Sequence, residues 1–162
     1  AGNIMAIAYL GLGSNIGDRV ENLNSAITKL SEVPGIQVTK ISSRYETKPY
    51  GKTDQPDFMN MAIEVDTNLT PLDLLETVLG VEHELGRVRT EVWGPRNIDI
   101  DVLLYEELEL QLSDLKVPHP EMHLRSFVID PLNEIAPKKE HPTLKMTVEK
   151  IKEQLDKNQS DN

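Results

Sequence analysis

Two aspartates stand two positions apart in a short apolar run. Asp99 and Asp101 alternate with isoleucines in the segment IDIDVLL, residues 98–104. On a β-strand, side chains two residues apart face the same way, so both carboxylates are expected on one face. Adjacent anions repel one another and Asp is depleted in strands, which indicates a purpose such as Mg²⁺ binding through carboxylate, water and phosphate oxygens. The alternative is a solvated outer face that binds nothing.

Three of the chain's six arginines lie just before this strand. Arg87, Arg89 and Arg96 occur within residues 86–97, where glycines and a proline prevent a regular helix. Guanidinium groups are planar forks that match phosphate oxygens, and an arginine-rich loop beside paired carboxylates is typical of magnesium-nucleotide chemistry. The alternative is that these arginines pair with the many acidic residues. Taken with the two aspartates, the segment favours phosphate binding.

Other residues that could do chemistry give weaker signals. Residues 11–17, GLGSNIG, have their third glycine one position late for a dinucleotide fingerprint and lack a P-loop lysine. They predict a tight strand-to-helix turn. His119, which lies between two prolines, and the nearby His123 and Arg125 are candidates for phosphate contacts, although a lone histidine is more often structural. No nucleophile motif supports covalent catalysis.

Four of the seven aromatic residues occur in or beside turn-rich, charged stretches. They are Tyr50, Phe58, Trp93 and Phe127. Aromatic side chains in such places either anchor loops on the core or hold a flat ligand between their rings. The sequence leaves both interpretations open.

The elements expected to position these residues alternate between strands and helices. Strands are predicted at residues 6–12, 36–45, 59–67 and 98–104, with a bulge in the second. One helix is predicted after the cap Asp18, and another from the cap Thr70 to Gly86. Apolar residues recur at helical spacing in the first helix at Val20, Leu23, Ile27 and Leu30. The second helix is expected to bury Leu72, Leu75, Val78, Leu79 and Leu85.

The order β-α-β-β-α-β predicts an α+β, ferredoxin-like sandwich, an antiparallel sheet with helices packed on it. Residues 46–57 contain prolines and a glycine among polar residues and predict a long loop. Beyond residue 104, five prolines predict an irregular C-terminal extension of short pieces. A last helix is expected at residues 147–155, with disorder from about residue 157. Many unrelated activities share this fold, so the fold alone assigns no function.

Composition narrows the possible partners. The 162 residues, 38% of them hydrophobic, predict a single domain over 1–162, in which residues 1–4 are taken as a cloning remnant without a role. A net charge of −10 argues against nucleic acid as the main partner. The lack of cysteine excludes disulfides and thiolate metal sites. Without a long apolar run or a leader pattern, a cytoplasmic protein with no membrane partner is expected.

Four segments resemble the 6-hydroxymethyl-7,8-dihydropterin pyrophosphokinase family of the folate pathway. They are LGLGSNIGDR, YETKPYGKTDQPDFMN, GRVRTEVWGPRNIDIDVLLY and VPHPEMHLRSFVIDPLNEIAP. The segments span most of the chain in the family's order and spacing, and WGPRNIDIDVLL followed by VPHP is highly specific. The resemblance implies transfer of the terminal diphosphate of ATP to the pterin's hydroxymethyl oxygen, with release of AMP.

The resemblance also implies roles for individual residues. Asp99 and Asp101 would ligate two Mg²⁺ ions that bridge the phosphates of the co-substrate ATP, while Arg87 and Arg96 would neutralise charge in the transition state. Trp93 would close over the site, and Asn60 would read the edge of a pterin held between two rings. The implied nucleotide contacts are Glu82, Arg89, Trp93, Arg96, His119 and Arg125. The implied pterin pocket is Thr47, Lys48, Tyr50, Phe58, Asn60, Trp93 and Phe127.

Some positions depart from the family's usual pattern. Lys48 stands where the pocket usually has a smaller or apolar residue, and its side chain is expected to point outward. Val92 replaces a common basic residue, Asn97 stands where Thr is frequent, and Leu79 occupies a position that is often Gln. No dedicated base is evident. The hypothesis is that a metal-bound hydroxyl group is acidified, with Asp101 nearby.

Two other classes of function remain open from the residues alone. A two-metal phosphodiesterase or nuclease would also use paired carboxylates, but the acidic charge counts against it. A non-enzymatic purine- or pterin-binding module would share the aromatic residues but would not need the aspartates. The expected partners are therefore small molecules, ATP and hydroxymethyldihydropterin. A monomer is expected, with a weak dimer as the alternative.

Overall fold

A five-stranded antiparallel sheet forms the middle layer of the molecule. The computed structural model describes residues 5–48, 56–86 and 97–160. The sheet consists of β1 (Ala6–Ser14), β2 (Ile36–Ile41), β3 (Tyr45–Thr47), β4 (Phe58–Thr67) and β5 (Asp99–Tyr105). The strand order is β2-β4-β1-β5, and β3 also pairs with β4. Because α1 connects β1 to β2 and α2 connects β4 to β5, the predicted ferredoxin-like order is confirmed.

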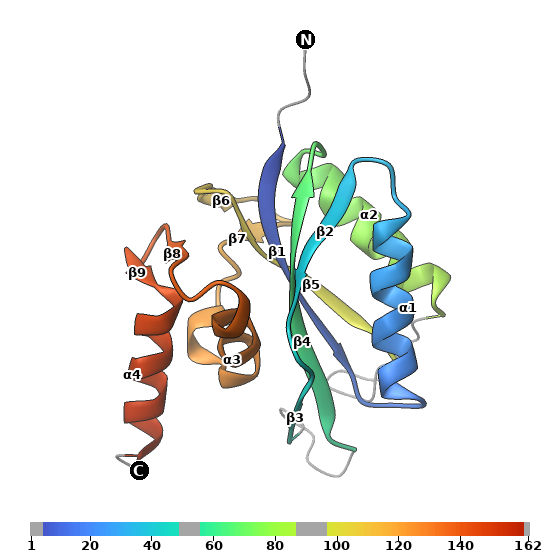
Figure 1. Ribbon diagram of the computed structural model, residues 1–162. Helices are drawn as coiled ribbons and strands as arrows, with labels where there is room; N and C mark the ends of the chain where they lie inside the picture. The colour runs from blue at the N-terminus through green and yellow to red at the C-terminus, as the bar shows by residue number, and fades with distance from the viewer. Residues whose placement is uncertain (1–4, 49–55, 87–96, 161–162) are drawn as a thin grey trace.

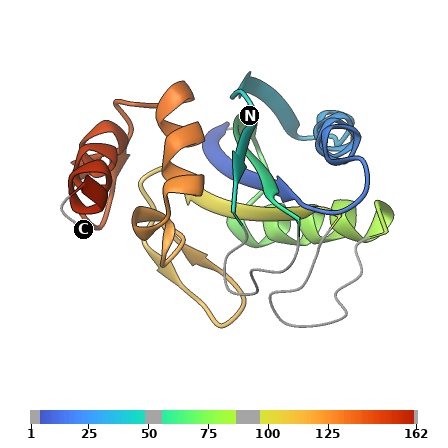
Figure 2. The ribbon, with the colours of Figure 1, turned by 90° about the horizontal axis from the view of Figure 1, so that it is seen from below.

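Helices cover both faces of this sheet (Figure 1). They are α1 (Arg19–Ser31), α2 (Pro71–Glu84), α3 (Ser126–Ile135) and α4 (Val148–Ser160). The first two pack on one face, and α3 packs on the other. Figure 2 shows that α4 lies farther from the sheet than α3, on which it packs. Within the described ranges, none of the helices has the length and apolarity needed to cross a bilayer.

Side chains of β1 alternate between two hydrophobic cores. Leu10 and Leu12 face α1 and α2 and contact a core that includes Leu23 and Val78. Tyr9 faces the opposite way, into a second core. The buried members of this second core include Leu103, Met122, Ile129, Leu132, Val148 and Ile151. The central sheet therefore belongs to both cores, and the C-terminal segment is part of the folded unit.

The helix caps are the ones that the sequence predicts. Asp18 Oδ1 accepts a hydrogen bond from Glu21 N at 3.0 Å at the start of α1. Thr70 Oγ1 accepts one from Asp73 N at 3.2 Å at the start of α2. Gly86 follows α2 with a φ of 77°, a conformation that favours glycine.

The buried face of α2 matches the predicted one only in part. Leu72 and Leu79 were expected to be buried but are 48% and 51% exposed. Val78 is buried as predicted, and Leu75 and Leu85 are partly buried against the same core. The helix also buries Leu74 and Val81, which were not predicted. Leucines lie around much of α2, so apolar periodicity alone could not select the face that meets the sheet.

The strand predicted at residues 36–45 is interrupted. A register shift between Val38 and Lys40 confirms the bulge, but β2 ends at Ile41 and β3 begins only at Tyr45. At the break, Ser42 N donates to Ala62 O at 2.9 Å, and Ser42 Oγ accepts from Ala62 N at 2.9 Å. The hydroxyl oxygen of Ser42 thus takes the place of a backbone carbonyl oxygen as the acceptor for Ala62 N. β3 then extends to Thr47, inside the segment predicted to be a loop.

The C-terminal extension is more regular than predicted. It contains two short ribbons, β6–β7 (Leu110–Gln111, Lys116–Val117) and β8–β9 (Glu140–His141, Met146–Thr147), and the 3₁₀-helix η1 (Met122–Leu124). α3 continues through Pro131, because burial of Ile129 and Leu132 outweighs the one backbone hydrogen bond that proline removes. α4 continues to Ser160, beyond the predicted end at residue 155 and into the region predicted to be disordered.

Candidate active site

The two aspartates of β5 project from one face of the strand, as predicted. Asp99 and Asp101 are partly exposed, whereas Ile100 and Val102 are buried in the core beneath α1 and α2. Opposite them on β1 lie Gly13 and Gly11, which pair with Asp99 and Asp101 respectively. Because glycine has no side chain, the surface beside the carboxylates is hollow.

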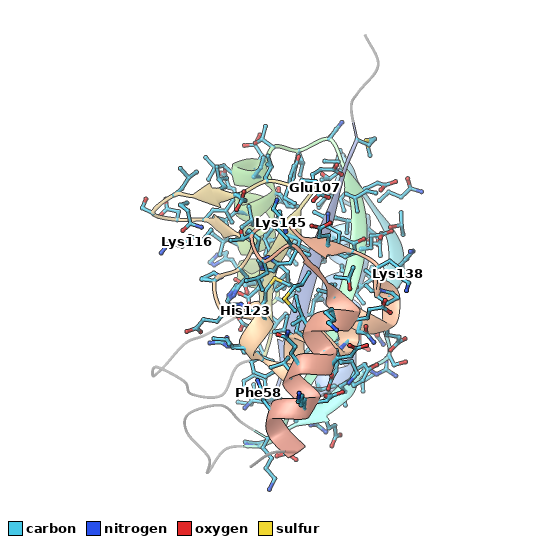
Figure 3. The ribbon with its side chains drawn as sticks, turned by 90° about the vertical axis from the view of Figure 1, so that its left-hand side faces the viewer. Phe58, Glu107, Lys116, His123, Lys138 and Lys145 are labelled. Atoms are coloured by element: carbon cyan, nitrogen blue, oxygen red, sulfur yellow. The ribbon has the colours of Figure 1, made fainter. Side chains whose placement is uncertain are left out.

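One pocket opens between this hollow and the N-terminal end of α3. It is lined by the two aspartates together with Thr47, Lys48, Phe58, Asn60, Arg125 and Phe127. Figure 3 shows Phe58, the first residue of β4, at the lower end of the molecule. The pocket unites the predicted pterin residues that lie within the described chain. Lys48 is exposed, yet it borders the pocket.

A second pocket lies on the other side of the aspartates, between α2 and the β6–β7 ribbon. Its lining includes Leu75, Leu79, Glu82, Lys116 and His119. Two of the predicted nucleotide residues, Glu82 and His119, therefore border this pocket. Arg125, also predicted to contact the nucleotide, borders the first pocket instead.

Asp99 and Asp101 line both pockets. A group bound in one pocket and a group bound in the other would therefore meet at the two carboxylates. This arrangement suits a transfer reaction between two bound molecules. Cations held by the aspartates would neutralise the charge of the transferred group.

Hydrogen bonding fixes the amide of Asn60 in the wall of the first pocket. Its Nδ2 donates to Thr47 Oγ1 at 2.8 Å, which joins β3 to β4. A Cβ atom on Gly13 would lie only 2.9 Å from Asn60 Oδ1. Gly13 therefore makes the space in which the Asn60 carbonyl oxygen sits, and Thr47 determines which way the amide faces.

Glu82 is a buried carboxylate that supports the strand carrying the aspartates. It is 4% exposed, and its Oε2 accepts a hydrogen bond from Ile100 N at 2.7 Å. Since β5 is an edge strand of the sheet, the Ile100 N–H points away from β1 and needs a partner. Glu82 accepts a hydrogen bond from this N–H, which belongs to the residue between Asp99 and Asp101.

His119 is held against β5 as a hydrogen-bond acceptor. Its backbone N donates to Leu103 O at 2.9 Å, and its Nδ1 accepts from Glu121 N at 3.3 Å. Burial lowers the pKa of His119, and the cation of Arg125 lowers it further, whereas Glu121 and Asp99 act in the opposite direction. These effects together favour the neutral ring, and because Nδ1 accepts a hydrogen bond, the proton of the neutral ring is on Nε2.

Arg125 lines the same pocket as the two aspartates and lies over the ring of Phe127. Its guanidinium carbon lies 5.6 Å from the centroid of the Phe127 ring, and its Nη2 pairs with Glu121. A cation at this distance over a ring face is attracted by the ring quadrupole. The contact orders both side chains at the entrance to α3.

Hydrogen bonds from Asn15 and from Arg19, the first residue of α1, hold the chain on both sides of residues 49–55. Arg19 Nη2 bonds Glu46 Oε1 at 2.9 Å, and Nη1 donates to Asp57 O at 3.0 Å. Asn15 Nδ2 donates to Pro56 O at 3.1 Å.

A further hydrogen bond joins described residues on either side of residues 87–96. Asn97 Nδ2 donates to Leu85 O at 2.8 Å. Asn97, one of the departures from the family pattern, thus ties the start of β5 to the end of α2.

Five of the predicted site residues lie outside the described residues. They are Tyr50, Arg87, Arg89, Trp93 and Arg96. Their roles remain predictions, as does the effect of Val92.

Some pocket residues were not predicted. Gly11 and Gly13 border the first pocket, and the signal for them was present, because glycines at alternate positions of a strand mark a close approach. Leu75 and Lys116 border the second pocket. Nothing in their sequence context distinguishes them from ordinary helix and turn residues.

The donor set around the aspartates is suited to magnesium. In the part of the chain that the structure describes, no third His, Cys, Asp or Glu side chain completes a metal site made of protein ligands alone. Two carboxylates beside open pockets leave the remaining coordination positions to water and substrate oxygens, the mode that Mg²⁺ favours. The residues present therefore fit Mg²⁺ bound together with a phosphate ligand.

Comparison with known proteins identifies the family. Residues 9–137 match the family described as 7,8-dihydro-6-hydroxymethylpterin-pyrophosphokinase (HPPK). The chain belongs to this pyrophosphokinase family. It is 50% identical over 129 residues to the 2-amino-4-hydroxy-6-hydroxymethyldihydropteridine pyrophosphokinase of Bacillus subtilis, covering 80% of this chain and 77% of that one. It is 41% identical to the protein of the same name from Haemophilus influenzae, covering 94% and 95%.

Solved structures of the pyrophosphokinase family share the fold. The wild-type HPPK-DHPS chain of Plasmodium falciparum superposes with a TM-score of 0.73 at 17% sequence identity. The match covers 94% of this chain and 45% of the Plasmodium chain, so this chain spans less than half the length of that protein. This structural similarity supports the α+β architecture described above for this chain.

Proposed function

We propose that the protein transfers the diphosphate of ATP to the hydroxymethyl oxygen of 6-hydroxymethyl-7,8-dihydropterin. In this reaction, the hydroxymethyl oxygen bonds to the β-phosphorus of ATP. The bond from that phosphorus to the α–β bridging oxygen breaks, AMP leaves, and the hydroxyl proton is released. The observation that carries the proposal is that Asp99 and Asp101 border both pockets of a chain whose relatives are named pyrophosphokinases.

The first pocket is proposed to hold the pterin. Phe58 and Phe127 are the two rings in its lining, and a flat bicycle fits between aromatic faces. Asn60 would face the ligand's polar edge, with its amide already oriented by Thr47. Preorganised groups of this kind reduce the entropy that is lost when the substrate binds.

The second pocket is proposed to hold ATP, with its phosphates directed at the aspartates. Neutral His119 would donate from Nε2 to a phosphate oxygen, and Lys116 would add positive charge at the pocket's border. Arg125 would act from the pterin side. Arg87 and Arg96 are proposed as the cations that neutralise charge developing in the transition state, and Arg89 and Trp93 as further nucleotide contacts.

Two Mg²⁺ ions are proposed as cofactors, with Asp99 and Asp101 as the protein ligands. When bound, Mg²⁺ neutralises phosphate charge and polarises the reacting groups. Glu82 keeps the strand between the two aspartates in place by accepting from Ile100 N. Asp101 is proposed to lie beside the hydroxyl proton as it is released.

The first test is the identity of the products. Incubated with ATP, Mg²⁺ and 6-hydroxymethyl-7,8-dihydropterin, the protein should form AMP and pterin diphosphate in equal amounts, as measured by anion-exchange chromatography. A parallel incubation without pterin should give little AMP. Formation of ADP would contradict the proposal, because it would mean that a single phosphoryl group is transferred.

We propose further that the protein acts in the cytoplasm as a monomer on these small molecules. The acidic charge supports small-molecule substrates over nucleic acid as partners. The alternative, a weak dimer, would be detected as a concentration-dependent mass in sedimentation or light scattering.

A further inference from the structure

Glu134, near the C-terminal end of α3, reaches the connection between β2 and β3. Its two carboxylate oxygens accept from Ser43 N at 3.1 and 3.0 Å, and Oε2 also accepts from Ser43 Oγ at 3.1 Å. Its Oε1 accepts from Tyr45 Oη at 2.7 Å. One exposed side chain therefore joins α3 to residues about ninety positions earlier in the sequence.

Besides the contacts with Glu134, β3 is held by its pairing with β4 and by the solvent-exposed ion pair of Glu46 with Arg19 at 2.9 Å. β3 is three residues long and pairs with β4 only from Tyr45 to Thr47. So short a strand is marginal by itself and takes its position from the contacts at its ends. Thr47, at the far end of β3, accepts from Asn60 Nδ2. The position of β3 thereby affects the amide in the pterin pocket.

The same helix carries the opposite wall of that pocket. Phe127 and Val128 are in the first turn of α3 and line the pocket, while Glu134 lies about two helical turns further along. Thr47, Phe58 and Asn60 face them from β3 and β4. Glu134 does not line the pocket, but its hydrogen bonds span the two elements that form the pocket's walls.

We propose that Glu134 is a positioning residue that sets the spacing of the pterin pocket by clamping α3 to β3. The inference rests on the proposed function. The clamp acts on pterin binding and not on nucleotide binding, because the second pocket is formed by α2, β5 and the β6–β7 ribbon. A carboxylate is the suitable side chain, since it offers two acceptors to the three donor groups and no competing donor.

The test compares two carboxylates of the same helix. Glu134→Ala should raise the Kd of hydroxymethyldihydropterin roughly tenfold, the size expected when hydrogen bonds to a charged group are lost. Calorimetry with Mg²⁺ and a non-hydrolysable ATP analogue present would measure this Kd. The Kd of the analogue itself should change by less than about twofold. Asp130→Ala is the matched control, because Asp130 Oδ1 accepts from Lys152 Nζ of α4 at 3.0 Å and acts on Tyr45 of β3 only through its charge. Its pterin Kd should stay within about twofold of the wild-type value.

Two milder variants keep the inference testable if Glu134→Ala folds poorly. Tyr45→Phe removes one donor and should raise the pterin Kd by a smaller factor. Its effect should largely disappear in the Glu134→Ala background, because both changes break the same contact. Glu134→Gln, which keeps one acceptor oxygen, should be intermediate between wild type and Glu134→Ala.

The possible outcomes separate the inference from the proposed function. If the wild type forms AMP and the Glu134 and Tyr45 variants bind pterin as tightly as Asp130→Ala does, the clamp has no role in the pocket and the inference is wrong. Equal loss of affinity for pterin and for the nucleotide analogue would also contradict it, since that result indicates general loosening. A wild type that forms no AMP would contradict the proposed function and the inference with it.

Discussion

The missing side chain at Gly13 leaves room for the amide of Asn60. The backbone of Gly13 is ordinary β-strand, so alanine is compatible with its conformation. The obstacle is steric, because the new methyl group would lie 2.9 Å from Asn60 Oδ1. Since that atom is at the end of a movable side chain, the strain is relieved by displacing the amide from Thr47 and from the pocket.

Gly13→Ala should therefore weaken pterin binding more than it weakens the fold. We expect the pterin Kd to rise by about tenfold, the equivalent of one hydrogen bond, with little change in Tm. Titration calorimetry and thermal melts measure the two effects. Gly80→Ala is the control, because Gly80 lies in α2 with nothing within 4 Å of a new Cβ. That change should stabilise the protein by up to about 1 kcal/mol and leave the pterin Kd unchanged.

At the scale of elements, the contact of α3 with β3 makes stability depend on pH. The hydrogen bond from Tyr45, followed by those from Ser43, holds the pKa of the Glu134 carboxyl below its ordinary value of 4.5. The same contact with Glu134 raises the pKa of Tyr45 to about 12. A carboxyl group with a lowered folded-state pKa stabilises the protein above its unfolded pKa. That contribution is lost as the pH falls through the folded pKa.

The Tm difference between wild type and Glu134→Gln should therefore be largest near neutral pH. It should shrink as the pH falls below 4.5 and vanish once the pH lies well below the lowered pKa of the folded state, because the carboxyl group is then protonated in both states. Thermal melts at a series of pH values measure this difference. A Tm difference that stays constant over the whole range would mean that the carboxylate's charge does not contribute to the contact.

Sequence patterns predicted elements where the determining contacts are local. The caps Asp18 and Thr70 and the stop at Gly86 act within a few residues, and all three are present as predicted. The break at Ser42 was missed because it depends on Ala62, twenty positions away. The continuity of α3 through Pro131 was missed for a related reason, since it depends on burial against the sheet.

The same distinction applies to the candidate site. The two-residue spacing of Asp99 and Asp101 was sufficient to place both carboxylates on one face of β5. That Glu82 would bond Ile100 N, or that Glu134 would bond Ser43, could not be read from local patterns. Those contacts exist only because the topology brings distant segments together.

At the scale of the whole molecule, the two cores share the central sheet and should unfold together. Leu132→Ala, in the second core where Leu132 is 0% exposed, should lower the free energy of unfolding by about 2–5 kcal/mol. Urea denaturation followed by circular dichroism should still show one transition. Leu124→Ala, at a residue that is 65% exposed, should change the free energy by less than about 0.5 kcal/mol. Two separate transitions would show that the C-terminal layer is an independent unit.

The central claim is that the diphosphate crosses between the two pockets at Asp99 and Asp101. The most direct measurement is the kcat of Asp99→Asn and Asp101→Asn at saturating Mg²⁺, ATP and pterin, with thermal melts of the same samples. We predict that kcat falls by roughly 10³-fold or more in each variant, because several kcal/mol of charge stabilisation are lost. The Tm should be unchanged or slightly raised, because removing one anion relieves repulsion in the metal-free protein. Near-wild-type turnover in either variant would contradict the claim.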